Sequence, residues 1–318
     1  MQAETHRPTW KTLLAFAIIY FVWGSTYLAI RVGVREVPPL LLAAMRFLFA
    51  GLALYGWMIA KGEPSPSLRE WKSASLLAIL IFVFDYGSLF WAERRVPSGI
   101  AAVVMATIPA FMALAEIVFL RTQELTIRLT LALFIGIAGV AVLMGRFLSL
   151  DGVPIDRKGA MALLFASISW SAASVIARKL PLPSSKAMSS GVQMLAGGVF
   201  LALTAAALGE FRDFHPLAIS IRAWLSLVYL IIAGSIIGFT AYVWLIHHES
   251  PTKVGTYAYV NPVVAVLVGY LLGGEALAAR TILGTLFILI SVVVITTTKA
   301  KKSVVAQPLE DAAERARS

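Results

Sequence analysis

The chain has 318 residues, of which 59% are hydrophobic and 14% are charged, and its mean hydropathy is +0.83. Soluble domains carry about 25% charged residues, so this balance excludes an ordinary soluble protein and indicates a membrane protein. The net charge is +10 and the chain has no cysteine, which excludes a disulfide framework, thiol catalysis and a thiolate metal site.

Stretches that are nearly free of charge follow one another along the chain, each long enough to cross a hydrocarbon core of about 30 Å as a helix. We expect ten membrane spans, at residues 11–30, 38–60, 72–92, 97–120, 127–146, 159–178, 187–208, 223–246, 252–274 and 280–298. The predicted fold class is therefore an all-α integral membrane protein of ten transmembrane helices. The first span resembles a signal peptide, but no small-residue cleavage site follows it, so we expect it to be retained.

The basic residues gather in loops and at the chain ends, where they bear on membrane orientation and do not indicate nucleic acid binding. With the N-terminus in the cytoplasm, the inner loops and ends hold more Lys and Arg than the outer loops do. This distribution favours both termini inside. The polar segment 301–318 is predicted to be a disordered cytoplasmic tail.

Landmark residues of the first half of the chain recur in the second half. Pairs separated by 147 positions are Trp23 and Trp170, Arg31 and Arg178, Arg46 and Gln193, and Gly51 and Gly198. Pairs separated by 153 positions are Trp71 and Trp224, Trp91 and Trp244, and Pro109 and Pro262. These recurrences predict a duplicated unit, with one five-helix repeat in residues 1–150 and a second in residues 151–300.

An odd number of spans in each unit means that the second copy enters the membrane from the opposite side, so we expect inverted repeats. Inverted repeats are typical of secondary transporters, whose substrate site lies near the membrane midplane between the repeats. The duplication therefore predicts a transporter that opens this site to each side in turn.

Pro109 and Pro262 lie inside the fourth and ninth predicted spans. A proline within a helix removes a backbone hydrogen bond and kinks the helix. The freed carbonyl is tolerated only where protein or a watery cavity satisfies it. We predict two kinked helices that curve around a common cavity and serve in gating. Asn261 either satisfies the freed carbonyl or contacts the substrate.

Several runs of sequence resemble the EamA family of the drug/metabolite transporter superfamily, and in particular its bacterial inner-membrane exporters of amino acids and metabolites. The runs are WGSTYLAIRVGV (23–34), AAMRF (43–47), VPSGIAAVVMATIPAF (96–111) and SPTKVGTYAYVNPVVAVLVGYLLGGE (250–275). The resemblance covers nearly all of residues 11–298. It implies ten helices in two inverted repeats, cytoplasmic termini, and export of small metabolites that are often amino acids.

Three ionisable side chains lie within the predicted spans and clear of their ends, where a charge is costly and needs a partner or water: Arg46, Asp85 and Glu116. Arg46 and Asp85 each lie about 12 Å below the same membrane surface. Either they neutralise each other, or Arg46 binds a substrate carboxylate while Asp85 orients it or receives a substrate ammonium. Glu116 is close to Arg121 in sequence, so we expect it to snorkel or to form a loop ion pair.

The second repeat has Gln193 and Gly238 where the first has Arg46 and Asp85. We therefore expect charge on one side of a pseudo-symmetric cavity, which suits a zwitterionic ligand. A structural pair that arose in one half by drift would leave the same asymmetry. The family resemblance implies that related exporters commonly have a basic residue in the second span, so Arg46 is equally compatible with a framework role.

Aromatic side chains are predicted to form the substrate pocket. The aromatic candidates are Trp23, Tyr27, Tyr86, Trp170 and Tyr259, and polar Ser25, Thr26 and Gln193 are candidates to complete the lining. Such a pocket suits amino acids with apolar or aromatic side chains, or flat cations. Trp91, Trp244 and Tyr257 are instead expected at the membrane interface. Gly136, Gly139 and Gly284 are expected to let spans five and ten approach closely.

Other functional classes lack the residues that they need. An intramembrane enzyme requires a metal-ligand cluster or a nucleophile with a base, and a channel requires a filter motif, and the sequence offers neither. We predict a non-enzymatic exporter of amino acids and related metabolites in a bacterial inner membrane, with a multidrug or purine/nucleoside exporter as the alternative. We expect no cofactor, no metal and no obligate protein partner; its partners are the small-molecule substrate and membrane lipid.

Overall fold

The computed structural model describes residues 9–95, 101, 104–143, 156–212, 214–264 and 279–298. Within these ranges all regular elements are helices, which confirms the all-α class. The α-helices are α1 (Thr9–Gly33), α2 (Pro39–Ala60), α3 (Leu68–Ala78), α4 (Gly87–Glu93), α6 (Ile108–Ala115), α7 (Ile127–Leu143), α9 (Arg157–Ile176), α10 (Lys186–Ala207), α11 (Ile221–Tyr229), α12 (Gly238–His248), α13 (Pro251–Gly255) and α15 (Ala279–Thr297). Residues 257–264 are also helical. The predicted tail at 301–318 lies outside the described residues.

Among the described residues, six helical runs are long and apolar enough to cross a membrane. They are Trp10–Gly33, Pro39–Ala60, Leu68–Glu93, Arg157–Ile176, Lys186–Ala207 and Ile221–His248. Shorter apolar helices, Ile108–Leu120, Ile127–Val142 and Ile282–Thr297, fall within the fourth, fifth and tenth predicted spans. The ninth predicted span is described only as far as residue 264. The count of ten spans therefore stays a prediction.

Serine side chains begin several of these helices after short loops. Ser67 accepts a hydrogen bond from the backbone N–H of Glu70, and the Glu70 carboxylate accepts one from the backbone N–H of Ser67 at 2.7 Å. This capping box starts α3. Ser185, Ser220 and Ser250 cap α10, α11 and α13, each by accepting from the backbone N–H three residues on. The caps satisfy backbone groups that the first helical turn leaves unpaired.

The third and eighth spans each change from α-helix to π-helix near their middle. The π-helix η1 (Ile79–Tyr86) joins α3 to α4, and η4 (Leu230–Ile237) joins α11 to α12. A shorter π-helix, η2 (Glu116–Leu120), follows α6, and the 3₁₀ turn η3 (Pro216–Ala218) precedes α11. π-Helices are rare and often lie at functional sites. No pattern in the sequence indicated these π-helices.

Glycines bring α2 and α10 into backbone contact. A Cβ added at Gly51 of α2 would lie 2.7 Å from the Cα of Leu195 in α10. Conversely, a Cβ added at Gly198 of α10 would lie 2.6 Å from the backbone nitrogen of Leu48 in α2. Leu48 and Leu195, like Gly51 and Gly198, are 147 positions apart. Exchanging the two halves thus converts one contact into the other, as across a two-fold interface.

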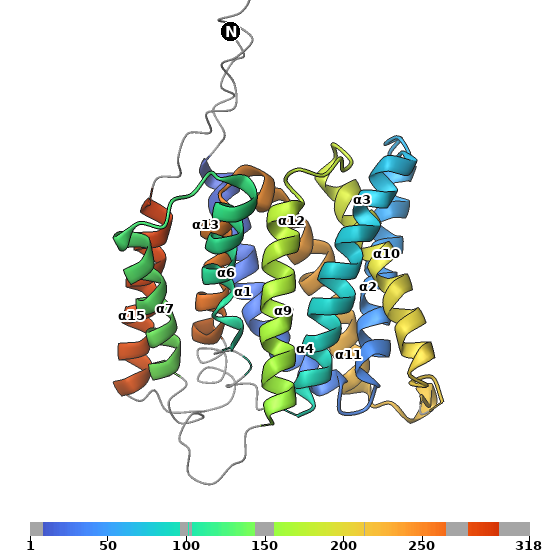
Figure 1. The fold of residues 1–318 in the computed structure, drawn as a ribbon. Coiled ribbons are helices and arrows are strands. Elements are labelled where there is room, and N and C mark those ends of the chain that lie inside the picture. Colours follow the sequence, from blue (N-terminus) through green and yellow to red (C-terminus); the bar gives the residue numbers. More distant parts are fainter. Residues whose placement is uncertain are drawn as a thin grey trace, which may run out of the picture.

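A second pair of helices, α7 and α15, also packs closely through glycine. Figure 1 shows them side by side at one edge of the bundle, while α2 and α10 lie toward the other edge. A Cβ added at Gly139 would lie 3.0 Å from the carbonyl oxygen of Gly284, which confirms the predicted close approach. The Ser291 hydroxyl donates to the Ala132 carbonyl at 2.6 Å across the same pair.

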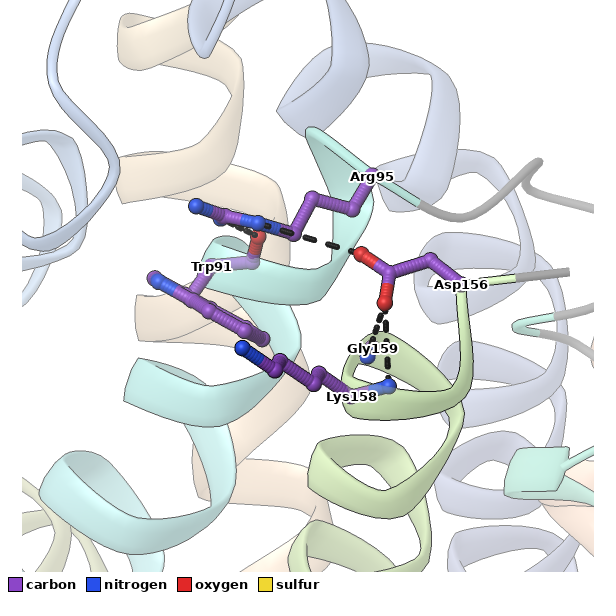
Figure 2. Close-up of polar contacts among 5 residues, drawn as sticks. All are labelled: Trp91, Arg95, Asp156, Lys158 and Gly159. Atoms are coloured by element: carbon purple, nitrogen blue, oxygen red, sulfur yellow. Dashed lines mark hydrogen bonds and ion pairs between the residues drawn. The ribbon is translucent and has the colours of Figure 1, made fainter.

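The end of the third span is joined to the start of the sixth (Figure 2). The Arg95 guanidinium lies 3.8 Å from the centre of the Trp91 ring and donates to the Trp91 carbonyl at 3.3 Å. Its Nε lies 3.9 Å from Oδ2 of Asp156, the N-cap residue of α9. The other Asp156 oxygen accepts from the backbone N–H groups of Lys158 and Gly159. Asp156 thus caps α9 and connects it to the end of α4.

The two predicted proline kinks have different outcomes. Pro109 lies in the first turn of α6, directly after a break at Ala106 and Thr107, so the helix is interrupted there as predicted. Pro262 lies inside the helical stretch 257–264, and the break in that span falls at Thr256 instead. The kink predicted at Pro262 itself stays a prediction. The Thr256 hydroxyl and backbone N–H both turn back onto the Lys253 carbonyl, at 2.6 and 3.2 Å, which ends α13.

Candidate functional site

A cavity of about 40 Å³ lies among helices from both halves of the chain. Its lining residues are Trp23, Thr26, Tyr27, Ile30, Asp85, Tyr86, Leu89, Met105, Trp170, Tyr257 and Asn261. The α1 residues among them recur at intervals of three and four, which is one face of a helix. The volume exceeds the roughly 10–15 Å³ that a water needs but is far below the roughly 300 Å³ of a small ligand pocket. A substrate therefore fits only after the surrounding helices move apart.

Five of the eleven residues given for the cavity lining are aromatic. Trp23 and Trp170, the repeat-related pair, meet edge to face with ring centres 5.5 Å apart. Tyr257 packs edge to face on Trp23 at 4.9 Å, and Tyr86 packs on Trp170 in the same way at 5.8 Å. The equivalent tryptophans of the two halves thus touch at the cavity, which places it at the junction of the two halves. Edge-to-face contacts between rings also stabilise the wall.

Polar atoms without partners point to this cavity as a binding site. Asp85 and Asn261 are each only 2% exposed, and Oδ1 of each has no hydrogen-bond partner of good geometry among the described residues. Nε1 of Trp170 is unpartnered in the same part of the chain. Buried polar atoms are normally bonded, so unbonded ones call for an explanation, and an absent ligand is one.

The two halves differ in a way that confines the carboxylate to the first half. The residue paired with Asp85 by the repeat is Gly238, and a Cβ added there would lie 2.5 Å from Nε1 of Trp23. The Trp23 indole instead donates from Nε1 to the Gly234 carbonyl at 3.0 Å. A side chain at position 238 would displace this indole, so the second half has no room for an acid there.

Arg46 was predicted to bind substrate, but it does not line the cavity. Its Nε donates to the Ser235 hydroxyl at 2.8 Å, and its guanidinium lies over the rings of Phe47 and Tyr86, at 4.7 and 5.1 Å. The predicted ion pair with Asp85 is not present among the described residues, and the predicted substrate contact of Arg46 stays a prediction. Because α2 and η4 pack together, the guanidinium is enclosed between them.

Three other predicted site residues also lie away from the cavity. Ser25 donates to the Val22 carbonyl and contacts the Tyr229 hydroxyl at 2.5 Å. Gln193 donates to Ser189 at 3.0 Å within α10. Tyr259 donates to the Leu133 carbonyl of α7 at 3.1 Å. Tyr259 is two residues from Tyr257, about 200° around a helix, so the two tyrosines face opposite sides.

Comparison with known proteins identifies the family. The EamA-like transporter family matches residues 10–145 and 157–297. The chain belongs to the EamA-like transporter family. It is 39% identical to the uncharacterized inner membrane transporter YedA of Escherichia coli, over 94% of this chain and 95% of YedA. It is 26% identical to protein PecM of Dickeya dadantii, over 86% of this chain and 88% of PecM. A solved crystal structure that is 23% identical superposes with a TM-score of 0.72, over 91% of this chain and 96% of the solved chain, and shows the same fold.

In this EamA-like transporter, Tyr257 was the aromatic lining residue that sequence reasoning assigned wrongly. It was expected at the membrane interface, yet it is 5% exposed and lines the cavity. The available signal was its spacing of four residues from Asn261, which puts both on one helix face. Ile30, Leu89 and Met105 complete the apolar lining, and nothing distinguished them from ordinary core residues. Thr26, considered for the lining, does contribute to it.

Two glutamates of the EamA-like transporter link its halves at opposite ends of the eighth span. Glu116, predicted to snorkel or pair with Arg121, is fully buried. Its Oε2 accepts from the Thr252 backbone N–H at 3.1 Å and hydroxyl at 2.8 Å, and Oε1 accepts from Thr122 at 3.0 Å. That prediction was wrong because the carboxylate turns inward and accepts hydrogen bonds from the first turn of α13.

The described residues bring together no cluster of three or more metal-ligating side chains.

The other glutamate, Glu36, lies at the far end of that span. Its Oε2 accepts from the Ser220 backbone N–H at 2.6 Å, and Oε1 accepts from the Ser220 hydroxyl at 2.7 Å. The backbone bond and then the hydroxyl bond lower the pKa of Glu36 below its ordinary value of 4.5. Ser220 and Thr252 bracket Ile221–His248, so the two links lie roughly 40 Å apart along the helix axis.

Proposed function

We propose that this EamA-like transporter is a secondary exporter of amino acids, aromatic and other neutral ones above all, and of related small metabolites. The observation that carries the proposal is the contact between Trp23 and Trp170 beside unpartnered Asp85 and Asn261. Aromatic walls suit apolar and aromatic side chains, and a few buried polar atoms suit a polar backbone group. The description of YedA as an inner membrane transporter of Escherichia coli supports a bacterial inner membrane as the location.

We further propose two inverted five-helix repeats, at residues 1–150 and 151–300, which alternate the access of the cavity between the two membrane sides. The reciprocal contacts of Gly51 and Gly198 support a two-fold relation between the halves, and the two family-matched segments support the duplication. In this proposal both termini and the tail 301–318 are cytoplasmic. The small cavity supports alternation, because binding and release require helix movement.

The substrate site in this proposal consists of Trp23, Tyr27, Asp85, Tyr86, Trp170, Tyr257 and Asn261. Arg46 acts behind it as a positioning residue through its contact with Tyr86. Helix breaks beside Pro109 and at Thr256 serve as the flexible points of the fourth and ninth spans, because a broken backbone hydrogen-bond ladder bends more easily. Pro262 has no backbone N–H, so it cannot bond the carbonyl of Ala258 four residues earlier in the helix.

A second candidate is export of planar drugs or of purines and nucleosides by the same site. The aromatic wall favours it, because flat rings stack on Trp and Tyr side chains and π faces attract cations. An amide such as that of Asn261 also pairs readily with a purine edge. The two candidates therefore share the cavity and differ in substrate alone.

Counterflow in proteoliposomes tests the proposal. Proteoliposomes that contain the purified chain are loaded with unlabelled aromatic, aliphatic, basic or acidic amino acids. Uptake of each labelled counterpart is then followed without an ion gradient. Uptake of neutral amino acids above empty liposomes is the expected result. Trp170→Ala should remove it by opening the aromatic wall, whereas Trp57→Ala, on the exposed face of α2, should retain it. Exchange of adenosine alone would favour the second candidate.

A further inference from the structure

Asp85 turns a carboxylate oxygen toward the cavity with no group bonded to it. Arg46, the buried cation on the neighbouring span, bonds to Ser235 instead. Asn261 lines the same cavity with its own unpartnered oxygen. An isolated buried carboxylate is strongly unfavourable, so a cation or a proton has to balance it.

The rest of the described lining offers no cationic side chain that could bind an anion in the way that Asp85 could bind a cation. It contains no arginine, lysine or histidine. Nε1 of Trp170 is a neutral donor that interacts with the Tyr242 side chain, and the Thr26 hydroxyl already donates to the Trp23 carbonyl at 2.7 Å. A substrate carboxylate therefore finds no opposite charge, and it would lie near Asp85, which repels it.

An ammonium group meets complementary chemistry on every side. Asp85 supplies a charged acceptor and Asn261 a neutral one. The rings of Trp23, Tyr86 and Trp170 supply faces and edges around them, and ring faces attract cations at close range. The Gly238 position in the opposite half excludes a second acid, so one cationic centre is matched by one carboxylate.

We propose that the cavity recognises its substrate through a protonated amine, held by Asp85 and Asn261 among the aromatic rings, and that a carboxylate on the substrate is not required. The inference rests on the proposed function, because it names the part of an amino acid that this site binds. It extends the substrate class to primary amines with an apolar or aromatic body. It excludes acids that lack an amine.

Two analogues of phenylalanine test this on the unsubstituted protein. 2-Phenylethylamine keeps the amine and lacks the carboxylate, whereas 3-phenylpropionate keeps the carboxylate and lacks the amine. Binding of radiolabelled 2-phenylethylamine to the purified chain in detergent is measured by scintillation proximity, with both compounds as competitors. We expect 2-phenylethylamine to compete at least about tenfold better than 3-phenylpropionate, because the charged hydrogen bond is available to it alone. Equal competition, or no binding of 2-phenylethylamine, overturns the proposal.

A matched pair of variants assigns the effect to Asp85. Glu93 lies on the same span, is 7% exposed and has two unpartnered carboxylate oxygens, but it does not line the cavity. Asp85→Asn should weaken 2-phenylethylamine binding by about tenfold or more, and Glu93→Gln should leave it unchanged. Equal losses in the two variants, or full binding by folded Asp85→Asn, overturn the assignment. If Asp85→Asn does not fold, the analogue comparison on the unsubstituted chain decides.

The same measurements separate this inference from the proposed function. Asp85-dependent binding of 2-phenylethylamine without counterflow of any amino acid supports the inference and rejects amino-acid export. Counterflow of amino acids with 3-phenylpropionate competing as well as 2-phenylethylamine supports export and rejects recognition through the amine.

Discussion

Arg46 and Asp85 lie at similar depth on neighbouring spans, yet their surroundings differ. Arg46 has a hydrogen bond to Ser235 and two aromatic rings against its guanidinium, while its Nη1 lacks a partner. Asp85 instead lines the cavity. A charge that is already bonded by the fold stabilises the fold, whereas a charge left unbonded at a cavity is available to a ligand. The two residues therefore have separate roles.

Arg46→Gln introduces the residue that the second half has at the equivalent position. We expect the unfolding temperature in detergent to fall by a few degrees, because a hydrogen bond to a charged group contributes about 1.5–3 kcal/mol. Affinity for 2-phenylethylamine should change much less than in Asp85→Asn. Tryptophan fluorescence on heating and the binding assay measure the two effects.

Ser235→Ala serves as the control for Arg46→Gln, because it removes the same hydrogen bond from the other side. The two losses should be less than additive when combined. An unchanged unfolding temperature in Arg46→Gln together with lost amino-acid binding would contradict the positioning role and restore the predicted carboxylate contact.

At the scale of elements, the glycines of α2 and α10 determine how the halves join. The backbones approach so closely at Gly51 and Gly198 that no side chain fits between them. Lipid offers helices no hydrophobic reason to associate, so close packing at small residues is a principal source of their affinity. The contact between these helices therefore depends on two positions with no side chain.

Gly51→Ala should destabilise the protein, and Gly56→Ala on the same helix should not. The added methyl at position 51 meets the backbone of Leu195, which cannot turn aside, whereas Gly56 has open space within 4 Å. Overpacking of this kind costs about 1–3 kcal/mol. Thermal unfolding of the two variants in detergent measures the difference, and equal melting temperatures would contradict the close contact.

Glu36 makes a pH-dependent contribution at the start of α11. Because its pKa is lower in the folded chain, its stabilising bonds to Ser220 are fully present above the ordinary value of 4.5 and are lost as pH falls through the lowered value. Glu36→Gln should therefore lower the melting temperature slightly at neutral pH and flatten its fall in acid. Melting curves from neutral to acidic pH measure this, with Glu63→Gln in another loop as the control. Parallel curves for Glu36→Gln and the unsubstituted chain would refute it.

At the scale of the whole molecule, the cavity lies between two links that join the halves. Glu36 with Ser220 and Glu116 with Thr252 lie at opposite ends of the eighth span, and each pairs a first-half carboxylate with the start of a second-half helix. If access alternates between the membrane sides, each link has to open at one stage of the cycle. The chain has no cysteine, which allows cross-links to be introduced at chosen positions.

Joining either link covalently should stop transport. Cysteines replace Glu36 and Ser220 in one variant and Glu116 and Thr252 in another, and a short bis-methanethiosulfonate reagent cross-links each pair. We expect counterflow to be lost in both variants and restored by reductant. The same reagent on a single-cysteine variant controls for modification alone. Full counterflow in a variant with a complete cross-link would show that its link does not open.

Much of the site was predictable because depth within a span, aromatic character and the repeat can all be read from the sequence. Trp23, Tyr27, Asp85, Tyr86, Trp170 and Asn261 were all predicted and line the cavity. Arg46, Gln193 and Tyr259 were predicted on the same properties and do not line it, because these properties do not fix which side of a helix faces the cavity. Tyr257 was missed for the same reason. The π-helix η1 also turns its side chains to other directions than an α-helix of the same residues would, and no periodicity in the sequence indicates this change.

The sequence by itself determined that this is an all-helical membrane protein of the EamA-like family, because apolar length and recurrent residues are properties of the chain. The tertiary structure decided which buried charge meets the cavity. Two ionisable groups at equal depth look alike in a sequence, but Ser235 and the ring of Tyr86 reach Arg46 from other elements, and no described group bonds Oδ1 of Asp85. Bonding partners of a buried charge come from distant parts of the chain, so packing alone assigns Arg46 to the fold and Asp85 to the cavity.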